Sequence, residues 1–205
     1  MARHGGSVLA DRAAAVQHGL VHVSFKRTGV RRYAVSVAVP GHPTLAADPA
    51  PGYDDDIPHD LVHYIVEAEL RIANGVYGRA ARGAGTFIAT AEHDASSRQR
   101  TRQQRKQSKR ERALRSQGGQ AAAEMATSER LAALSDVVWR RKAGQRPDGQ
   151  RSAPVLRPED ASIIERIVAR LDALAPSWRA LPVGGELVFE WPNLEPTRRP
   201  SLTVY

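Results

Sequence analysis

The chain has 205 residues, of which 41% are hydrophobic and 25% are charged, and this mix suits one globular domain with an ordinary core. It contains no cysteine, which excludes disulfides, thiolate zinc sites, iron–sulfur clusters and cysteine nucleophiles. A bound metal ion would therefore need nitrogen and oxygen ligands. Neither a signal peptide nor a run of about 18 apolar residues is present, so we expect a cytoplasmic protein without a membrane contact.

The net charge of +8 is concentrated in one segment. From Arg98 to Arg115 there are nine Lys or Arg residues and one acidic residue, Glu111. Removing these from the totals of 30 basic and 22 acidic residues leaves 21 of each, so the rest of the chain is neutral. The segment could bind nucleic acid phosphates without sequence preference, or an acidic partner. It has no aromatic residue to stack on bases, which favours a solvated linker.

The first half of the chain predicts a β-hairpin. Apolar and polar residues alternate over 21–26 and again over 33–39, with a turn at Thr28-Gly29 between them. A short helix is expected before the hairpin, at 11–17. The prolines and glycines of residues 40–53 predict an extended loop without a regular element.

The strongest helix signal in the sequence follows that loop. Asp54, Asp55 and Asp56 offer capping carboxylates, and Pro58 suits the first turn because its missing N–H would be unpaired there in any case. We expect this helix from about residue 58 to 73, with its end at Asn74-Gly75.

The other elements are predicted from periodicity and from turn residues. They are a short helix at 76–82, a strand or helix edge at 86–91, a helix at 122–142, a helix after Pro158, and strands at 186–191 and 202–205. Together these elements predict an α+β fold, in which the antiparallel hairpin and the C-terminal strands pack with about three main helices. We divide the chain into an N-terminal part (1–95), a basic polar insertion or linker (96–120), and a second part of the same domain (121–205).

Two histidines in the helix at 58–73 could bind a metal ion. At 100° per residue, His59 and His63 project from the same side, at the edge of a broad apolar face. Imidazoles one helical turn apart can share a single ion. A catalytic zinc site normally has three protein ligands, so a third side chain would have to come from elsewhere. The structural alternative is that the two histidines bind no metal and only donate hydrogen bonds to backbone carbonyls or to a neighbouring carboxylate.

The segment His59-Asp60-Leu61-Val62-His63 resembles the His-Glu-x-x-His helix of zinc metallopeptidases. The resemblance implies that His59 and His63 are the zinc ligands and that Asp60 holds the place of the general base. Aspartate is one methylene shorter than glutamate, which weakens the hydrolytic role more than the metal-binding role. The stretch 57–67 also resembles an uncharacterised family of bacterial proteins, and this second resemblance implies no activity.

The third ligand stays open. Glu67 would lie about 12 Å along the helix axis from His59, too far to share one ion, and it is expected on the polar face of the helix in an ion pair with Arg71. Glu69 falls within the apolar face, so it should have an arginine partner or a raised pKa. Tyr64 also falls on the polar face. The candidate third ligands are Glu92, His93, Asp94 and the three residues Asp54, Asp55 and Asp56.

These observations support two hypotheses about function. The first is a protein that binds zinc or another divalent metal through His59 and His63, with hydrolysis of an unknown substrate as an extension that uses Asp60. The alternative is a non-enzymatic adaptor whose segment from Arg98 to Arg115 binds nucleic acid or an acidic partner. The oligomeric state does not follow from the sequence.

Overall fold

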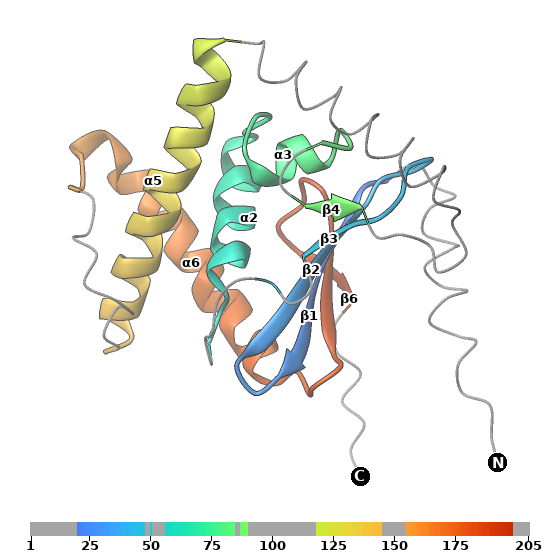
Figure 1. Ribbon diagram of the computed structural model, residues 1–205. Helices are drawn as coiled ribbons and strands as arrows, with labels where there is room; N and C mark the ends of the chain where they lie inside the picture. The colour runs from blue at the N-terminus through green and yellow to red at the C-terminus, as the bar shows by residue number, and fades with distance from the viewer. Residues whose placement is uncertain are drawn as a thin grey trace, which may run out of the picture.

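A computed structural model describes residues 20–47, 50, 56–84, 87–89, 118–144 and 155–198. Within these ranges the fold is α+β, with one six-stranded antiparallel sheet in the order β4-β3-β2-β1-β5-β6 and helices packed against it (Figure 1). The strands are β1 (His22–Gly29), β2 (Arg32–Ala38), β3 (Leu45–Ala47), β4 (Ile88–Ala89), β5 (Glu186–Glu190) and β6 (Pro196–Arg198). The helices are α2 (His59–Leu70), α3 (Val76–Ala80), α5 (Gly119–Lys142), a 3-10 turn (Pro158–Asp160) and α6 (Ala161–Arg179).

The predicted hairpin is confirmed as β1 and β2. Phe25 pairs with Val35 across the two strands, and both are completely buried. Because successive strand residues point to opposite faces, the alternation in the sequence places one apolar set on the core face of the sheet. The turn lies at Val30 and Arg31, two residues later than expected.

The prediction of an extended loop over 40–53 is wrong for three of its residues, because β3 pairs with β2 there. The short strand β6, beside β5, was also not predicted. Both strands have three residues. A strand this short shows no alternation, and the backbone of its longer neighbour determines where it forms. The elements expected at 11–17 and 202–205 lie outside the described residues.

The helix at 58–73 is confirmed, but its ends differ from the prediction. It ends at Leu70, because Arg71 adopts a left-handed conformation with φ 53° and the Ile72 N–H bonds to the Glu67 carbonyl at 2.9 Å. Among the described residues no side chain caps its first turn. The Asp56 carboxylate instead forms an ion pair with Arg179 of α6 at 2.6 Å.

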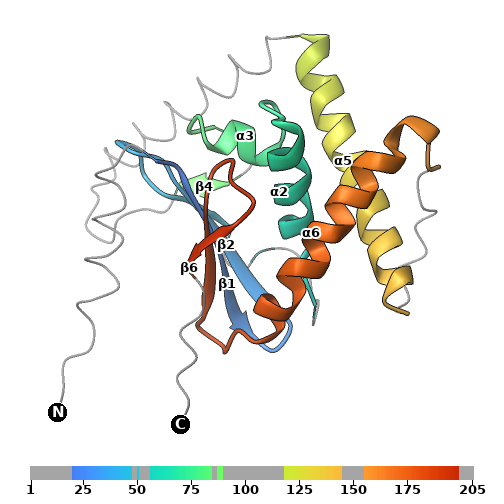
Figure 2. The same cartoon turned by 180° about the vertical axis from the view of Figure 1, so that it is seen from behind.

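The helices form two layers on one side of the sheet, as the two opposite views show (Figures 1 and 2). Helices α2 and α6 lie against the sheet, where Tyr64 contacts Phe25 and Trp178 contacts Tyr33 through their rings. Helix α5 contacts both α2 and α6 on the side away from the sheet. One hydrophobic core joins all these elements.

Helix α2 is consequently buried on almost every side. All residues from Leu61 to Ala68 are buried, including Tyr64 and Glu67, which the sequence placed on a polar face. That placement was wrong because the periodicity of a helix cannot show which elements pack around it. Tyr64 lies against Phe25 and Phe189 of the sheet, and Glu67 lies against the start of α3 and against Ser128 of α5. Among the described helices, none is long and apolar enough to cross a membrane.

Candidate metal site between helices α2 and α5

Helix α2 brings the two predicted histidines together. The centroids of the His59 and His63 rings are 4.8 Å apart, and the ring planes stand at 85° to each other. His59 is exposed, whereas His63 is 6% exposed. The first turn of α2 therefore holds one imidazole at the surface and one just beneath it.

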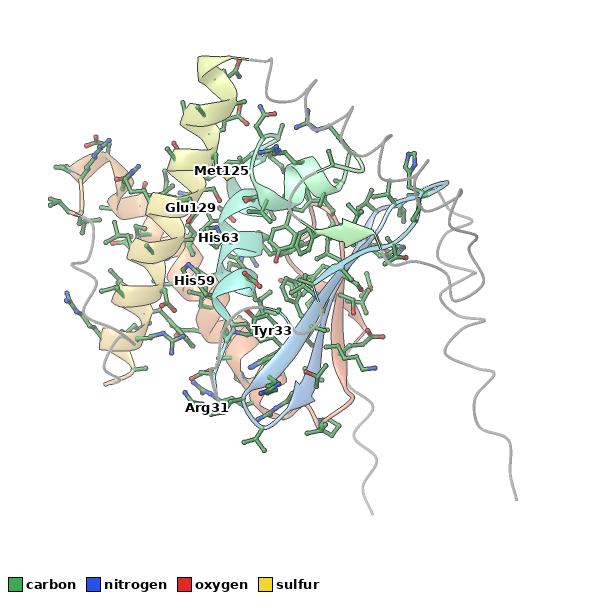
Figure 3. The ribbon with its side chains drawn as sticks, in the orientation of Figure 1. Arg31, Tyr33, His59, His63, Met125 and Glu129 are labelled. Carbon is green, nitrogen blue, oxygen red and sulfur yellow. The ribbon has the colours of Figure 1, made fainter. Side chains whose placement is uncertain are left out.

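Helix α5 adds a carboxylate to this pair. The Glu129 Oε2 atom lies 3.6 Å from His63 Nε2, and the Glu129 side chain is 60% exposed. Figure 3 shows His59, His63 and Glu129 close together where α2 and α5 face each other. The sequence analysis did not find Glu129, and no local signal in the sequence connects it with a histidine 66 positions earlier.

The other nitrogen of His63 faces the interior. Its Nδ1 atom lies 3.2 Å from the Ser128 Oγ atom, and the Ser128 hydroxyl donates to Glu67 Oε1 at 2.9 Å. Ser128 and Glu67 are both fully buried. A continuous hydrogen-bonded chain therefore runs from the edge of the molecule into its interior, through His63, Ser128 and Glu67.

Glu67 does not pair with Arg71, so that prediction is wrong. Its carboxylate instead accepts hydrogen bonds from the backbone N–H groups of Val76 at 2.7 Å, Tyr77 at 2.8 Å and Gly78 at 3.3 Å. These groups form the start of α3, where helical N–H groups have no partner within the helix. Burial raises the pKa of Glu67, and the hydrogen bonds from Ser128 and the backbone act in the opposite direction.

Asp60 has a different partner. Tyr33 of β2 donates its hydroxyl to Asp60 Oδ2 at 2.9 Å, and Tyr77 donates to the Asp60 backbone carbonyl at 2.9 Å. Burial raises the pKa of the Asp60 carboxyl, while the Tyr33 hydrogen bond and the nearby His59 lower it. The structure thus joins Asp60 to the sheet through Tyr33.

His63 is neutral at physiological pH. Burial, and secondarily the charge of His59, lower the pKa of His63 to about 3. A neutral imidazole has one N–H and one lone pair, and the lone pair is what a metal ion requires. A group with this pKa is a poor proton acceptor near pH 7, which argues against a general-base role.

Five of the six candidate third ligands lie outside the described residues: Asp54, Asp55, Glu92, His93 and Asp94. The sixth, Asp56, is bound to Arg179. Within the described part of the chain, no three His, Asp or Glu side chains are already arranged so that they could hold a metal ion. The prediction for Glu69 is confirmed, because Arg166 of α6 binds its carboxylate at 2.7 Å.

The basic segment from Arg98 to Arg115 also lies outside the described residues, so its binding to nucleic acid or to an acidic partner stays a prediction. No family model, no curated protein and no solved structure matches the chain.

Proposed function

We propose that the protein binds a divalent transition metal ion, such as zinc, through His59, His63 and Glu129. The observation that carries the proposal is the 3.6 Å separation between His63 Nε2 and Glu129 Oε2, at a place where the second histidine ring is 4.8 Å away. Two ligand atoms on a tetrahedral zinc ion, each about 2.0 to 2.2 Å from the metal, are separated by roughly 3.4 Å. The pair His63 and Glu129 is therefore close to the spacing that zinc requires.

Small side-chain rotations would complete the site. Glu129 is 60% exposed and His59 is exposed, so both can change rotamer without disturbing the core. His63 is held in place by Ser128. Two imidazoles and one carboxylate are a ligand set that suits zinc, and such a set leaves a fourth position for water.

The proposal is confined to metal binding. A hydrolytic step that used Asp60 as its base would require the Asp60 carboxylate to leave the Tyr33 hydroxyl and approach a metal-bound water. Metal binding by the other three side chains does not need that change.

The test is metal content by elemental mass spectrometry, together with zinc titration by calorimetry, on tag-free protein prepared without chelator. We expect about one zinc ion per chain in the wild type. The double variant His59→Ala/His63→Ala should lose this binding, and Glu129→Gln should weaken it. His42→Ala is the matched control, because this exposed histidine belongs to the connection between β2 and β3.

The proposal fails if the wild type binds no zinc after reconstitution, or if the double variant binds as much zinc as the His42→Ala control. Circular dichroism of each variant would show that the fold persists. Binding that survives in Glu129→Gln at full affinity would remove Glu129 from the ligand set.

A further inference from the structure

The inner end of the hydrogen-bonded chain determines where its protons lie. Glu67 Oε1 accepts from the Val76 N–H and from the Ser128 hydroxyl, and Glu67 Oε2 accepts from the Tyr77 and Gly78 N–H groups. Backbone N–H groups can only donate. The three of them therefore require Glu67 to act as an acceptor.

Ser128 has one hydroxyl proton, and this proton is used in the bond to Glu67. Towards His63, Ser128 Oγ can then only accept. The 3.2 Å contact between these residues consequently requires a proton on His63 Nδ1. A neutral imidazole that is protonated at Nδ1 has its lone pair on Nε2, and Nε2 is the atom that lies 3.6 Å from Glu129.

We infer that Ser128 and Glu67 are positioning residues, which hold His63 in the tautomer protonated at Nδ1 and present its Nε2 lone pair to the site between α2 and α5. The alternative tautomer would carry its lone pair on Nδ1, against a buried serine that no metal ion can reach. A partner of this kind behind a ligating histidine commonly sets both ring orientation and tautomer. The consequence for zinc rests on the proposed function, whereas the tautomer itself does not.

The first experiment reads the tautomer directly, by ¹⁵N NMR correlation of the histidine rings in metal-free protein near pH 7. The signals of His63 are identified by their loss in His63→Gln. We expect a protonated Nδ1 and an unprotonated Nε2 in the wild type, and a mixture of tautomers in Ser128→Ala. A wild-type His63 protonated at Nε2 would overturn the inference, whatever the protein does with zinc.

Ser135→Ala is the matched control. Ser135 is another fully buried serine of α5, and its hydroxyl has no hydrogen-bond partner among the described residues. This variant also removes a buried hydroxyl from α5, but it should leave the His63 signals unchanged. Ser128→Thr keeps the hydroxyl and should retain the wild-type tautomer. Thermal unfolding of each variant shows whether it is folded.

The second experiment is zinc titration of the same variants. Ser128→Ala should bind zinc about 10- to 100-fold more weakly than the wild type, as expected for loss of a group that orients a ligand. Ser128→Thr and Ser135→Ala should stay within about threefold of the wild type. Wild-type affinity in Ser128→Ala, combined with lost binding in His63→Gln, would overturn the positioning role while leaving the metal site standing.

Discussion

Replacing Glu67 by glutamine changes one buried carboxylate oxygen into an NH₂ group with almost no change of shape. Each oxygen of Glu67 accepts two hydrogen bonds, and the residue is 0% exposed, so water cannot replace a lost partner. If the NH₂ group takes the Oε2 position, it faces the N–H groups of Tyr77 and Gly78. If it takes the Oε1 position, it faces the N–H of Val76.

The magnitude follows from these contacts. A hydrogen bond to a charged group contributes about 1.5 to 3 kcal/mol, and a buried donor left without a partner costs about 1 to 3 kcal/mol. The glutamine also removes a buried charge, and the raised pKa of Glu67 shows that this charge is costly, so part of the loss is offset. We expect Glu67→Gln to lower the free energy of unfolding by about 2 to 4 kcal/mol.

The assay is urea unfolding followed by circular dichroism, with chelator present so that metal binding does not contribute. Glu165→Gln is the control, because Glu165 is an exposed glutamate of α6, and it should change the free energy of unfolding by less than about 0.5 kcal/mol. A loss below about 1 kcal/mol in Glu67→Gln, with an unchanged slope against urea, would refute the view that this carboxylate holds α3 to α2 and α5.

Two further predictions concern the same region. Gly75→Ala should destabilise the protein, because a Cβ atom at Gly75 would overlap the Glu67 carboxylate, which four hydrogen bonds hold in place. In a Glu67→Ala background the substitution should cost much less, and equal costs in both backgrounds, measured by urea unfolding, would contradict the overlap. The second prediction concerns pH. The pKa of His63 is about 3 in the folded protein and about 6.5 in the unfolded chain, so between these values the unfolded state binds one more proton. The free energy of unfolding therefore decreases as the pH falls from 6.5 towards 3. The wild type should therefore lose up to about 1.4 kcal/mol per pH unit more than His63→Gln between pH 6 and 4, and parallel pH profiles of the two proteins would show that His63 is not buried in its neutral form. Taking the difference from His63→Gln is necessary because the raised pKa values of Asp60 and Glu67 act in the opposite direction.

Tertiary contacts determine which partners the side chains of a correctly predicted helix have. Helix α2 was recognised from the proline and apolar spacing of its own residues, and its histidine pair follows from the same spacing. The role of Glu67 was missed because its partners belong to other elements: the start of α3 and Ser128 of α5. The periodicity of α2 carries no information about where those elements pack against it. A carboxylate that periodicity places on the polar face became the most completely hydrogen-bonded group described in the site.

The sequence by itself determined the elements whose signals are local. The period-two alternation of β1 and β2 and the 3.6-residue period of α5 and α6 select which face each element buries, because that selection depends only on neighbouring residues. It also determined the one-turn spacing of His59 and His63. Only the tertiary structure decided that two residues of α5 face the two ring nitrogens of His63, with Ser128 at Nδ1 and Glu129 at Nε2. That arrangement depends on how two helices pack over a long sequence separation, and packing is set by the shapes of both surfaces together, which neither segment specifies alone.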